Sequence, residues 1–514
     1  MAGPVGRRGF VGGGAAAVST VLWSPRRPFA ARPMGFAAAR HLLSRTGFGG
    51  TPADIDSIAM QDPVAAVDHL LSESAERREA ITSPPSWLGE GPASLRRRQQ
   101  AADAERAEAQ RKVGVDGKVL LVTRPVEEQG RELRNWWVEE MLVTDRPLVE
   151  RMVLFWHGHF TSSFLKVRYA PALFRQNALF RREALGNFAT LLREVARDPA
   201  MLIYLDGMRS VARQPNENFA RELLELFTLG EGQYGEADIK EAARAFTGWT
   251  VDRETGLFKT RDGAHDDGLK TVLGQTGRFG GDDVIAILLR HPRTAETVVE
   301  KLWREFVSLT PDPAAVKQLA SDFRRDYEIR PLLRALLLTP AFHDPANRAG
   351  LIKSPVDLIV GTVRLLGLPV PEKTPLVRMM QGLGQMPFDP PNVRGWAGGE
   401  SWVTTYTLLL RQQFLRRIIE ATTVASADGP EERRPSMAGT AGGNAMSMAD
   451  RPIEGRSLRQ AGNAARLGPT LAGTDPPTLL QTLLPCAPID MAETPRSAGA
   501  TAAAALLDTA YQLK

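Results

Sequence analysis

Apolar residues recur at helical spacing along most of this chain, and this periodicity is the feature that most limits its fold. In the segment that begins at Asp145, one apolar stripe is formed by Val149, Met152, Val153, Trp156 and Phe160. Spacings of three and four residues place side chains on one face of a helix, whereas a half-buried strand alternates at every second residue. A further helix is predicted from Arg175 to Arg197. The sequence therefore predicts a mostly α-helical fold: a large multi-helix domain with long ordered loops and little or no sheet.

The composition divides the 514 residues into four parts. Residues 34–425 carry the helical pattern and are predicted to form one large domain, since an apolar content of 43% is enough to fill a sizeable core. Residues 426–470 are biased toward Ala, Gly, Ser, Met and Arg, which is typical of a flexible low-complexity insertion. Residues 471–514 are predicted to be a C-terminal segment whose final helix packs on the main domain.

Residues 1–33 precede the helical domain and contain the run GRRGFVGGGAAAVSTVLW. The paired arginines Arg7 and Arg8, followed by a short apolar run, are typical of a twin-arginine export signal. The same run also fits a disordered basic leader. We therefore expect export by the twin-arginine route, to the periplasm or the cell exterior, with a cytoplasmic location as the alternative.

Charge and cysteine content exclude several classes of function. The 64 basic and 59 acidic side chains nearly balance, and no nucleic-acid-binding motif is present, so we expect no nucleic-acid partner. The single cysteine, Cys486, excludes an internal disulfide and a cysteine-rich metal site. The motifs GxxxxGK[ST], HExxH and GxSxG are absent from the sequence. No segment approaches the ~18 to 20 uninterrupted apolar residues of a membrane span.

The densest cluster of functional groups lies in the run PNENFARELLELFTLGEG, which begins at residue 215. Its apolar residues are sufficient for a helix that packs on a core, so its polar residues need another explanation. On a helix, Asn218 and Glu222 are four residues apart and Glu222 and Glu225 three, which places them on a shared face. Glu217 and Arg221 are also four residues apart. Carboxylates gathered on one helix face indicate a site without identifying its reaction.

Two other segments supply histidines. In FWHGHF, the residues His157 and His159 would point to the same side of a strand, but on a helix each residue turns by ~100° and the two imidazoles diverge. Only one of them then faces a given site, and His159 is preferred because it lies near the end of the buried stripe. The loop HDDGLKTVLG brings His265, Asp266 and Lys270 together with a further carboxylate.

Seven motifs occur together in one order: GFG near Gly47, FWHGHF, NENFARELLELFTLG, AFTGW, HDDGLKTVLG, KSPVDLIV and PFDPPNVRGWAGGESW. In combination they resemble the bacterial domain-of-unknown-function family 1800 (DUF1800), over nearly the whole chain from about Ala37. The resemblance implies a large helical domain, often behind an export signal. It implies no established activity.

Three classes of function remain open. The first is a metal-assisted hydrolase or oxidase, in which a divalent zinc, manganese or iron ion activates water. Carboxylates and imidazoles suit these ions, and the predicted metal ligands are His159, Glu222, Glu225 and His265. The base of such an enzyme is predicted to be Glu217 or Asp266.

The second class is a non-catalytic binding or scaffold protein for a small molecule, a carbohydrate, a peptide or a partner protein. The residues predicted to contact this ligand are Asn218, Arg221, Lys270, Arg394 and Trp396. The third class is purely structural, with no site. In that case a buried ion-pair network that orders the helical core is formed by Glu217, Arg221, Glu222 and Arg244.

Overall fold

The computed structural model describes residues 32–74, 79–116, 124–427, 471 and 473–514. Helices dominate this part of the chain, and its strands form two small sheets of two antiparallel strands each. The predicted mostly α-helical fold is therefore confirmed. The twin-arginine run and most of the predicted insertion lie outside the described residues.

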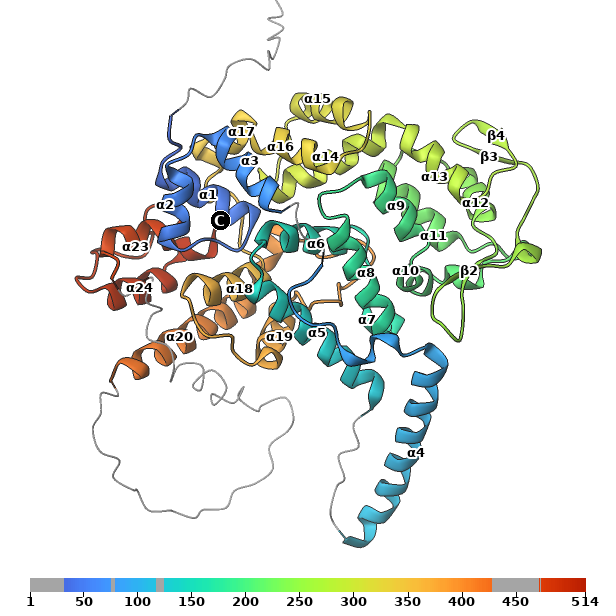
Figure 1. Cartoon of the computed structure of the whole chain (residues 1–514), viewed down its shortest axis with the longest axis horizontal. Coiled ribbons are helices and arrows are strands. Elements are labelled where there is room, and N and C mark those ends of the chain that lie inside the picture. Colours follow the sequence, from blue (N-terminus) through green and yellow to red (C-terminus); the bar gives the residue numbers. More distant parts are fainter. Residues whose placement is uncertain (1–31, 75–78, 117–123, 428–470, 472) are drawn as a thin grey trace, which may run out of the picture.

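The N-terminal third of the described chain consists of helices that mostly begin with proline. They are α1 (Phe36–Thr46), α2 (Pro52–Ala59), α3 (Pro63–Glu73), α4 (Pro92–Asp116), α5 (Pro125–Val143) and α6 (Pro147–His159), with a 3-10 turn η1 (Ser86–Gly89) before α4. Proline suits the first turn of a helix because the backbone N–H it lacks would have no partner within the helix. The charged helix α4 extends away from the body of the molecule (Figure 1).

The central part alternates short helices with the two sheets. Its helices are α7 (Phe164–Val167), α8 (Ala170–Arg182), α9 (Phe188–Ala196), α10 (Pro199–Tyr204), η2 (Gly207–Arg209), α11 (Glu217–Glu222), the π-helix η3 (Leu223–Leu229), α12 (Glu236–Ala245), η4 (Asp262–Ala264), α13 (Gly281–Arg290) and α14 (Pro292–Phe306). Its strands are β1 (Trp249–Val251), β2 (Phe258–Thr260), β3 (Lys270–Val272) and β4 (Gln275–Gly277). Strand β1 pairs with β2 and β3 with β4, so that Thr250 lies opposite Lys259 and Thr271 opposite Thr276.

The prediction of a single helix from Arg175 to Arg197 is wrong, because the structure has two helices, α8 and α9, with a break between them. Asn187 causes the new start: its side chain accepts a hydrogen bond from the amide of Thr190 and caps α9. Such a cap satisfies an amide that has no partner within the helix, and it competes with continuation of the preceding helix.

The C-terminal part is again helical. It comprises α15 (Pro313–Phe323), α16 (Ile329–Leu337), α17 (Pro340–His343), η5 (Pro345–Asn347), α18 (Pro355–Leu365), α19 (Lys373–Gly382), η6 (Gly399–Trp402), α20 (Thr405–Ala427), α23 (Pro476–Leu483), α24 (Ala498–Leu507) and η7 (Thr509–Gln512). Helix α23 contacts α1 and α2, and α24 contacts α20, so the last helices lie beside the first ones (Figure 1). No helix among the described residues is long and apolar enough to cross a membrane.

The core is continuous through the body and is centred on large aromatic side chains. Trp137, Trp156 and Trp303 are at most 1% exposed, and they come from α5, α6 and α14 respectively. Helix α6 contacts α1 and α8, while α14 contacts α1, α15 and the π-helix η3. This packing fixes α6 and α14 as the two rigid elements on which the candidate site is built.

Candidate functional site

The polar helix that the sequence predicts from residue 215 is two helices in series. Asn216 caps α11 by accepting a hydrogen bond from the amide of Asn218. From Leu223 to Leu229 the backbone is a π-helix, in which each amide bonds to the carbonyl five residues before it. The α-helical spacing that paired Glu222 with Glu225 therefore does not hold beyond the end of α11.

The two carboxylates consequently have different surroundings. Glu225 accepts hydrogen bonds from the Tyr234 hydroxyl at 2.7 Å and from Arg394 at 2.8 Å. Glu222 is half-buried, and burial, followed by the nearby charge of Glu225, raises its pKa. Arg394 also forms an ion pair of 2.7 Å with Glu231. Arg394 belongs to the run PFDPPNVRGWAGGESW, which we call the tryptophan-rich loop, and it therefore joins this loop to the π-helix region.

Helix α14 closes the C-terminal end of the π-helix. Thr297 donates to the carbonyl of Leu229 at 3.2 Å, and one turn later the Lys301 ammonium donates to the carbonyl of Leu226 at 2.7 Å. The last carbonyls of a helix have no amide partner within it and carry a partial negative charge, so a cation is favoured there. Lys301 is thereby held at a fixed position.

The Lys301 ammonium also lies 3.0 Å from Nδ1 of His159. An ammonium can only donate, so Nδ1 accepts and the imidazole is neutral. Burial, reinforced by the Lys301 charge, holds the pKa of His159 well below its usual value. Burial likewise lowers the pKa of Lys301 to about 8, with smaller contributions from Arg304 and Arg394.

The other histidine of the FWHGHF motif points elsewhere. Helix α6 continues through Gly158, so the imidazoles of His157 and His159 diverge. His157 is completely buried against the rings of Trp137, Phe388 and Trp396, and burial lowers its pKa to about 3. It is a core residue, and only His159 reaches the pocket described next.

The tryptophan-rich loop packs directly on α6. Trp396 lies against His157, and Gly395 adopts a φ of 81°, in the left-handed region that favours glycine. A Cβ atom at Gly395 would lie 2.5 Å from the carbonyl oxygen of Gly158. The two glycines therefore allow the loop to approach the helix closely enough for its side chains to wall a pocket.

A pocket of about 300 Å³ lies between α6, α14 and this loop. We call it the α6–α14 pocket. Its aromatic wall includes Phe155, Trp396 and Trp402. Its lining contains two carboxylates, Glu305 and Asp357, and five cationic side chains: Arg151, Lys301, Arg304, Arg394 and Lys514.

Both carboxylates of the pocket form ion pairs with cations of the lining. Asp357 pairs with Arg151 and with the Lys514 ammonium, the latter at 2.6 Å, and Glu305 lies 3.5 Å from Arg151. Desolvation of Asp357 is outweighed by these two cations, which hold its pKa far below the usual range. The charges of Lys301 and Arg304 on α14 are therefore not balanced within the lining.

The predicted residues of the HDDGLKTVLG loop do not reach this pocket. His265 Nδ1 lies 2.9 Å from the carbonyl of Thr247. Asp266 forms two hydrogen bonds with Arg244, at 2.7 and 3.1 Å, and this contact is the main cause that lowers the pKa of Asp266 to about 2. Lys270 donates to the carbonyls of Asp266 and Gly268. These contacts fasten the loop to α12.

The remaining predicted residues of the polar helix lie at the surface. Asn218 is exposed, and Arg221 forms ion pairs with Glu217 at 3.4 Å and with Glu236 at 2.8 Å. The side chain of Glu236 is 68% exposed, so the Arg221 pairs are not a buried network. Arg221 and Arg244 thus belong to two separate groups of ion pairs.

The structure does not bring the four predicted metal ligands together. Across the described ranges, no three or more His, Cys, Asp or Glu side chains are arranged to hold a metal ion. Nδ1 of His159 is bonded to Lys301, whereas its Nε2 has no hydrogen-bond partner among the described residues. Glu225 accepts from Arg394 and Tyr234, and His265 contacts Thr247. Of the predicted site residues, only His159, Arg394 and Trp396 line the α6–α14 pocket.

Of the five cations in the pocket lining, the sequence predicted Arg394 and missed the other four. The sequence did indicate that Arg151 is buried, because this charged residue lies inside the apolar run LVERMVLFW of α6. Lys301 and Arg304 gave no such signal, because the sequence KLWRE is also what a solvated helix face looks like.

A family model described as "Protein of unknown function (DUF1800)" matches residues 41–512. No curated protein and no solved structure matches the chain significantly. The family match covers nearly the whole chain and confirms the resemblance carried by the seven motifs. The chain belongs to the DUF1800 family of proteins of unknown function.

Proposed function

We propose that this protein binds a small anionic molecule in the α6–α14 pocket. The ligand carries a carboxylate or phosphate group together with a ring or apolar part, as an acidic carbohydrate does. The observation that carries this proposal is the positive charge that α14 presents to the pocket. Lys301 contacts a carbonyl and a neutral imidazole, and Arg304 has one long ion pair, with Glu300. The other three cations of the lining are paired with carboxylates at shorter distances. A cleft that is lined by one sign of charge attracts ligands of the opposite sign.

Lys301 is suited to hold the anionic group. Its ammonium has three N–H donors, and two of them are directed at the Leu226 carbonyl and at His159. One donor is left for a ligand. Because His159 is neutral and buried, it fixes the direction of the ammonium without cancelling its charge.

Arg304 lies three residues from Lys301, on the same face of α14. Its ion pair with Glu300 is long, at 3.8 Å, and its side chain is 47% exposed. Such a pair contributes little stability, so the guanidinium is free to turn toward a bound anion. Trp396 and Trp402 supply the apolar wall on which a sugar or other ring lies.

This is the binding class among the functions that the sequence leaves open. The metal-assisted class lacks a comparable observation, since the ligands it requires do not converge within the described residues. The cations at the pocket would instead disfavour a divalent metal ion by like-charge repulsion.

The proposal is tested by thermal melting of the full chain with pairs of compounds that differ in charge. Glucose 6-phosphate and glucuronate are compared with glucose, using the wild type, Arg304→Gln and the control Arg378→Gln. Arg378 is exposed and lies outside the pocket. We expect the two anions to raise the melting temperature, glucose to have no effect, and Arg304→Gln to weaken binding at least tenfold, because a charge-assisted contact contributes about 1.5–3 kcal/mol.

Two results would overturn the proposal. One is stabilisation by glucose as large as that by its anionic counterparts. The other is anion binding that is equal in Arg304→Gln, Arg378→Gln and the wild type.

We also propose that the chain is exported by the twin-arginine route, supported by Arg7 and Arg8 and the apolar run that follows them. Residues 1–33 fused to a reporter that functions only after export are expected to carry it across the membrane. Arg7→Lys combined with Arg8→Lys is expected to abolish transport. Transport that survives this double substitution would contradict the proposal.

A further inference from the structure

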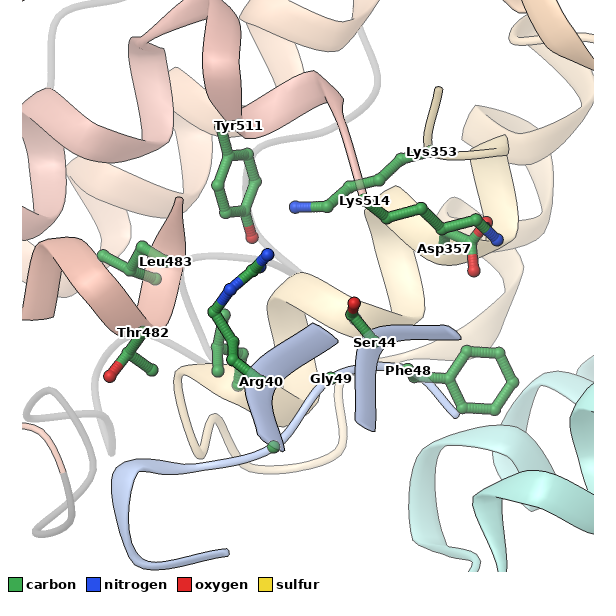
Figure 2. A pocket seen from close by; sticks show the side chains of 13 residues that line it. Arg40, Ser44, Phe48, Gly49, Lys353, Asp357, Thr482, Leu483, Tyr511 and Lys514 are labelled. Carbon is green, nitrogen blue, oxygen red and sulfur yellow. The ribbon is translucent and has the colours of Figure 1, made fainter. Parts of the chain in front are cut away.

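A second, smaller cavity shares Asp357 and Lys514 with the α6–α14 pocket. Its volume is about 30 Å³, and its lining comes from α1 and the residues that follow it, from Lys353 and α18, and from the C-terminal segment. Figure 2 shows the side chains of Arg40 and Lys353 extending into the same space, beside the ring of Tyr511. We call this space the Arg40 cavity.

Arg40 is a buried cation with an unsatisfied guanidinium. The residue is only 6% exposed, and its Nη2 has no hydrogen-bond partner among the residues that the structure describes. Burial is the main cause that lowers the pKa of Arg40 to about 10. A buried charge is costly unless it is paired, so the cavity as described leaves a destabilising group.

Arg45, five residues further along α1, shows that the same fold gives a buried arginine several partners, although its Nε has none among the described residues. Its guanidinium donates to the carbonyls of Phe306, Val307 and Asn347, the last at 2.7 Å. Arg40 has no equivalent set of carbonyl partners within the described ranges. The two arginines of α1 therefore differ in their hydrogen-bond partners, and Arg40 is the one that faces the cavity.

Lys353 is the second cation directed into the cavity. Its ammonium lies 3.5 Å from the centroid of the Tyr511 ring. None of the described carboxylates lies within ion-pair distance of it, and Asp357 is taken by Arg151 and Lys514. Burial, followed by the charge of Arg40, lowers the pKa of Lys353 to about 7.

The three hydroxyl groups of the lining, those of Ser44, Thr482 and Tyr511, have already donated their protons. Thr482 donates to the carbonyl of Thr478. Ser44 donates to the carbonyl of His41. Thr362 donates to the carbonyl of Leu358, so in the contact of 2.8 Å between Thr362 and Tyr511 it is the Tyr511 hydroxyl that donates. The side chains of the lining that keep donors for an occupant are Arg40, Lys353 and Lys514, and the Lys514 ammonium is already engaged by Asp357.

We propose that the Arg40 cavity is a binding site for a small inorganic oxyanion of the phosphate or sulfate class, held between the Arg40 guanidinium and the Lys353 ammonium. Arginine and lysine are the side chains that bind such anions, and the planar guanidinium matches two oxygens at once. The volume exceeds the ~10–15 Å³ that one water needs, so the cavity admits a group of a few atoms and excludes a metabolite.

The bound anion would connect three segments that are distant in the sequence. Arg40 belongs to α1, Lys353 precedes α18, and the Tyr511 ring belongs to the C-terminal segment. The expected role is therefore stabilisation of this junction. It is independent of the proposed ligand of the α6–α14 pocket, since Arg40 and Lys353 do not line that pocket.

The test measures thermal melting and isothermal titration of the full chain with sodium phosphate and sodium sulfate, against sodium chloride at equal ionic strength. The variants are Arg40→Met and Lys353→Met, with Lys317→Met as an exposed lysine control. We expect both oxyanions to bind and to raise the melting temperature of the wild type and of Lys317→Met. Each cavity variant is expected to lose at least tenfold in oxyanion affinity.

The melting temperatures of the two variants in sodium chloride alone distinguish this proposal from a purely structural role of Arg40 and Lys353. Because each methionine removes an unpaired buried charge, Arg40→Met and Lys353→Met are expected to melt at or above the wild type. Failure of the wild type to bind either oxyanion, or a chloride effect of equal size, would overturn the proposal. So would oxyanion affinity that is unchanged in both variants. Arg304→Gln is expected to keep the oxyanion effect, which distinguishes this site from the α6–α14 pocket.

Discussion

Replacing Lys353 by methionine removes a buried ammonium and keeps a side chain of similar length. Burial lowers the pKa of Lys353 from 10.5 to about 7, whereas in the unfolded chain it stays near ~10.4. The unfolded state therefore binds more protons between pH 7 and pH ~10.4, so wild-type stability rises with pH across this window. The charged groups that face Lys353 are Arg40 of α1, Asp357 of α18, Arg411 of α20 and Lys514.

The size of the effect follows from the pKa change. A pKa difference of one unit between the folded and unfolded states is worth about 1.4 kcal/mol. For Lys353, burying the charged ammonium therefore costs the folded state at most about 5 kcal/mol below pH 7. The ammonium is buried, but the Lys353 residue as a whole is half-buried, and screening by the nearby solvent reduces this cost to about 2–3 kcal/mol. For a chain of 514 residues, the average entropy of unfolding converts this to roughly 1 °C per kcal/mol. Lys353→Met is therefore expected to melt about 2–3 °C above the wild type at pH 6.

Scanning calorimetry between pH 6 and pH 10, with chloride as the only added anion, measures this difference. The gain is expected to shrink as pH rises, because the wild type loses the unfavourable charge. Lys317→Met, at an exposed position, is expected to show no such trend. A Lys353→Met protein that melts below the wild type at pH 6, or a difference that is constant with pH, would refute the reasoning.

Three further predictions concern the tryptophan-rich loop, the Asp266 loop and the predicted metal ligands. Gly395→Ala introduces a Cβ atom 2.5 Å from the carbonyl oxygen of Gly158 at a φ of 81°, so we expect a loss of about 1–3 kcal/mol in urea unfolding; an unchanged midpoint would contradict the close packing of the loop. Asp266→Asn is expected to lose about 1 kcal/mol at pH 7 and much less at pH 2. Arg244 lowers the pKa of Asp266 to about 2, so its stabilisation is present above pH ~4 and is lost as pH falls through 2. Added zinc, manganese or iron(II) is expected to leave the melting temperature unchanged, and a rise that His159→Ala abolishes would instead support the metal-assisted class.

The helices were predictable because their determinants are local. The apolar stripe of α6 is visible in the sequence at a spacing of three and four residues, and it also predicts correctly that His157 and His159 diverge. The break between α8 and α9 was missed, since a single cap at Asn187 outweighs a helical pattern that continues across it.

The π-helix from Leu223 to Leu229 could not be read from its sequence, which suits an α-helix equally well. Its carbonyls are satisfied by Thr297 and Lys301 of α14, about 70 residues further along the chain. A stabilising contact of that sequence separation leaves no local pattern. For this reason the carboxylate pairing that was predicted on α-helical spacing did not locate the site.

The buried cations were missed for a related reason. Arg40 follows apolar residues on an amphipathic helix, where an arginine is usually at the surface. Segments far along the chain surround it, including the residues before α18, helix α23 and Tyr511. The sequence shows which side chains are charged, but their burial depends on segments that lie hundreds of positions away.

The account depends most on the claim that the α6–α14 pocket selects its ligand by negative charge. The most direct measurement is isothermal titration of the wild type with glucose 6-phosphate and with glucose, which share the sugar ring and differ in the phosphate group. The account predicts binding of glucose 6-phosphate that is at least tenfold tighter and weakens with rising salt. Equal affinity for the two compounds, or an affinity for the anion that is insensitive to salt, would contradict it.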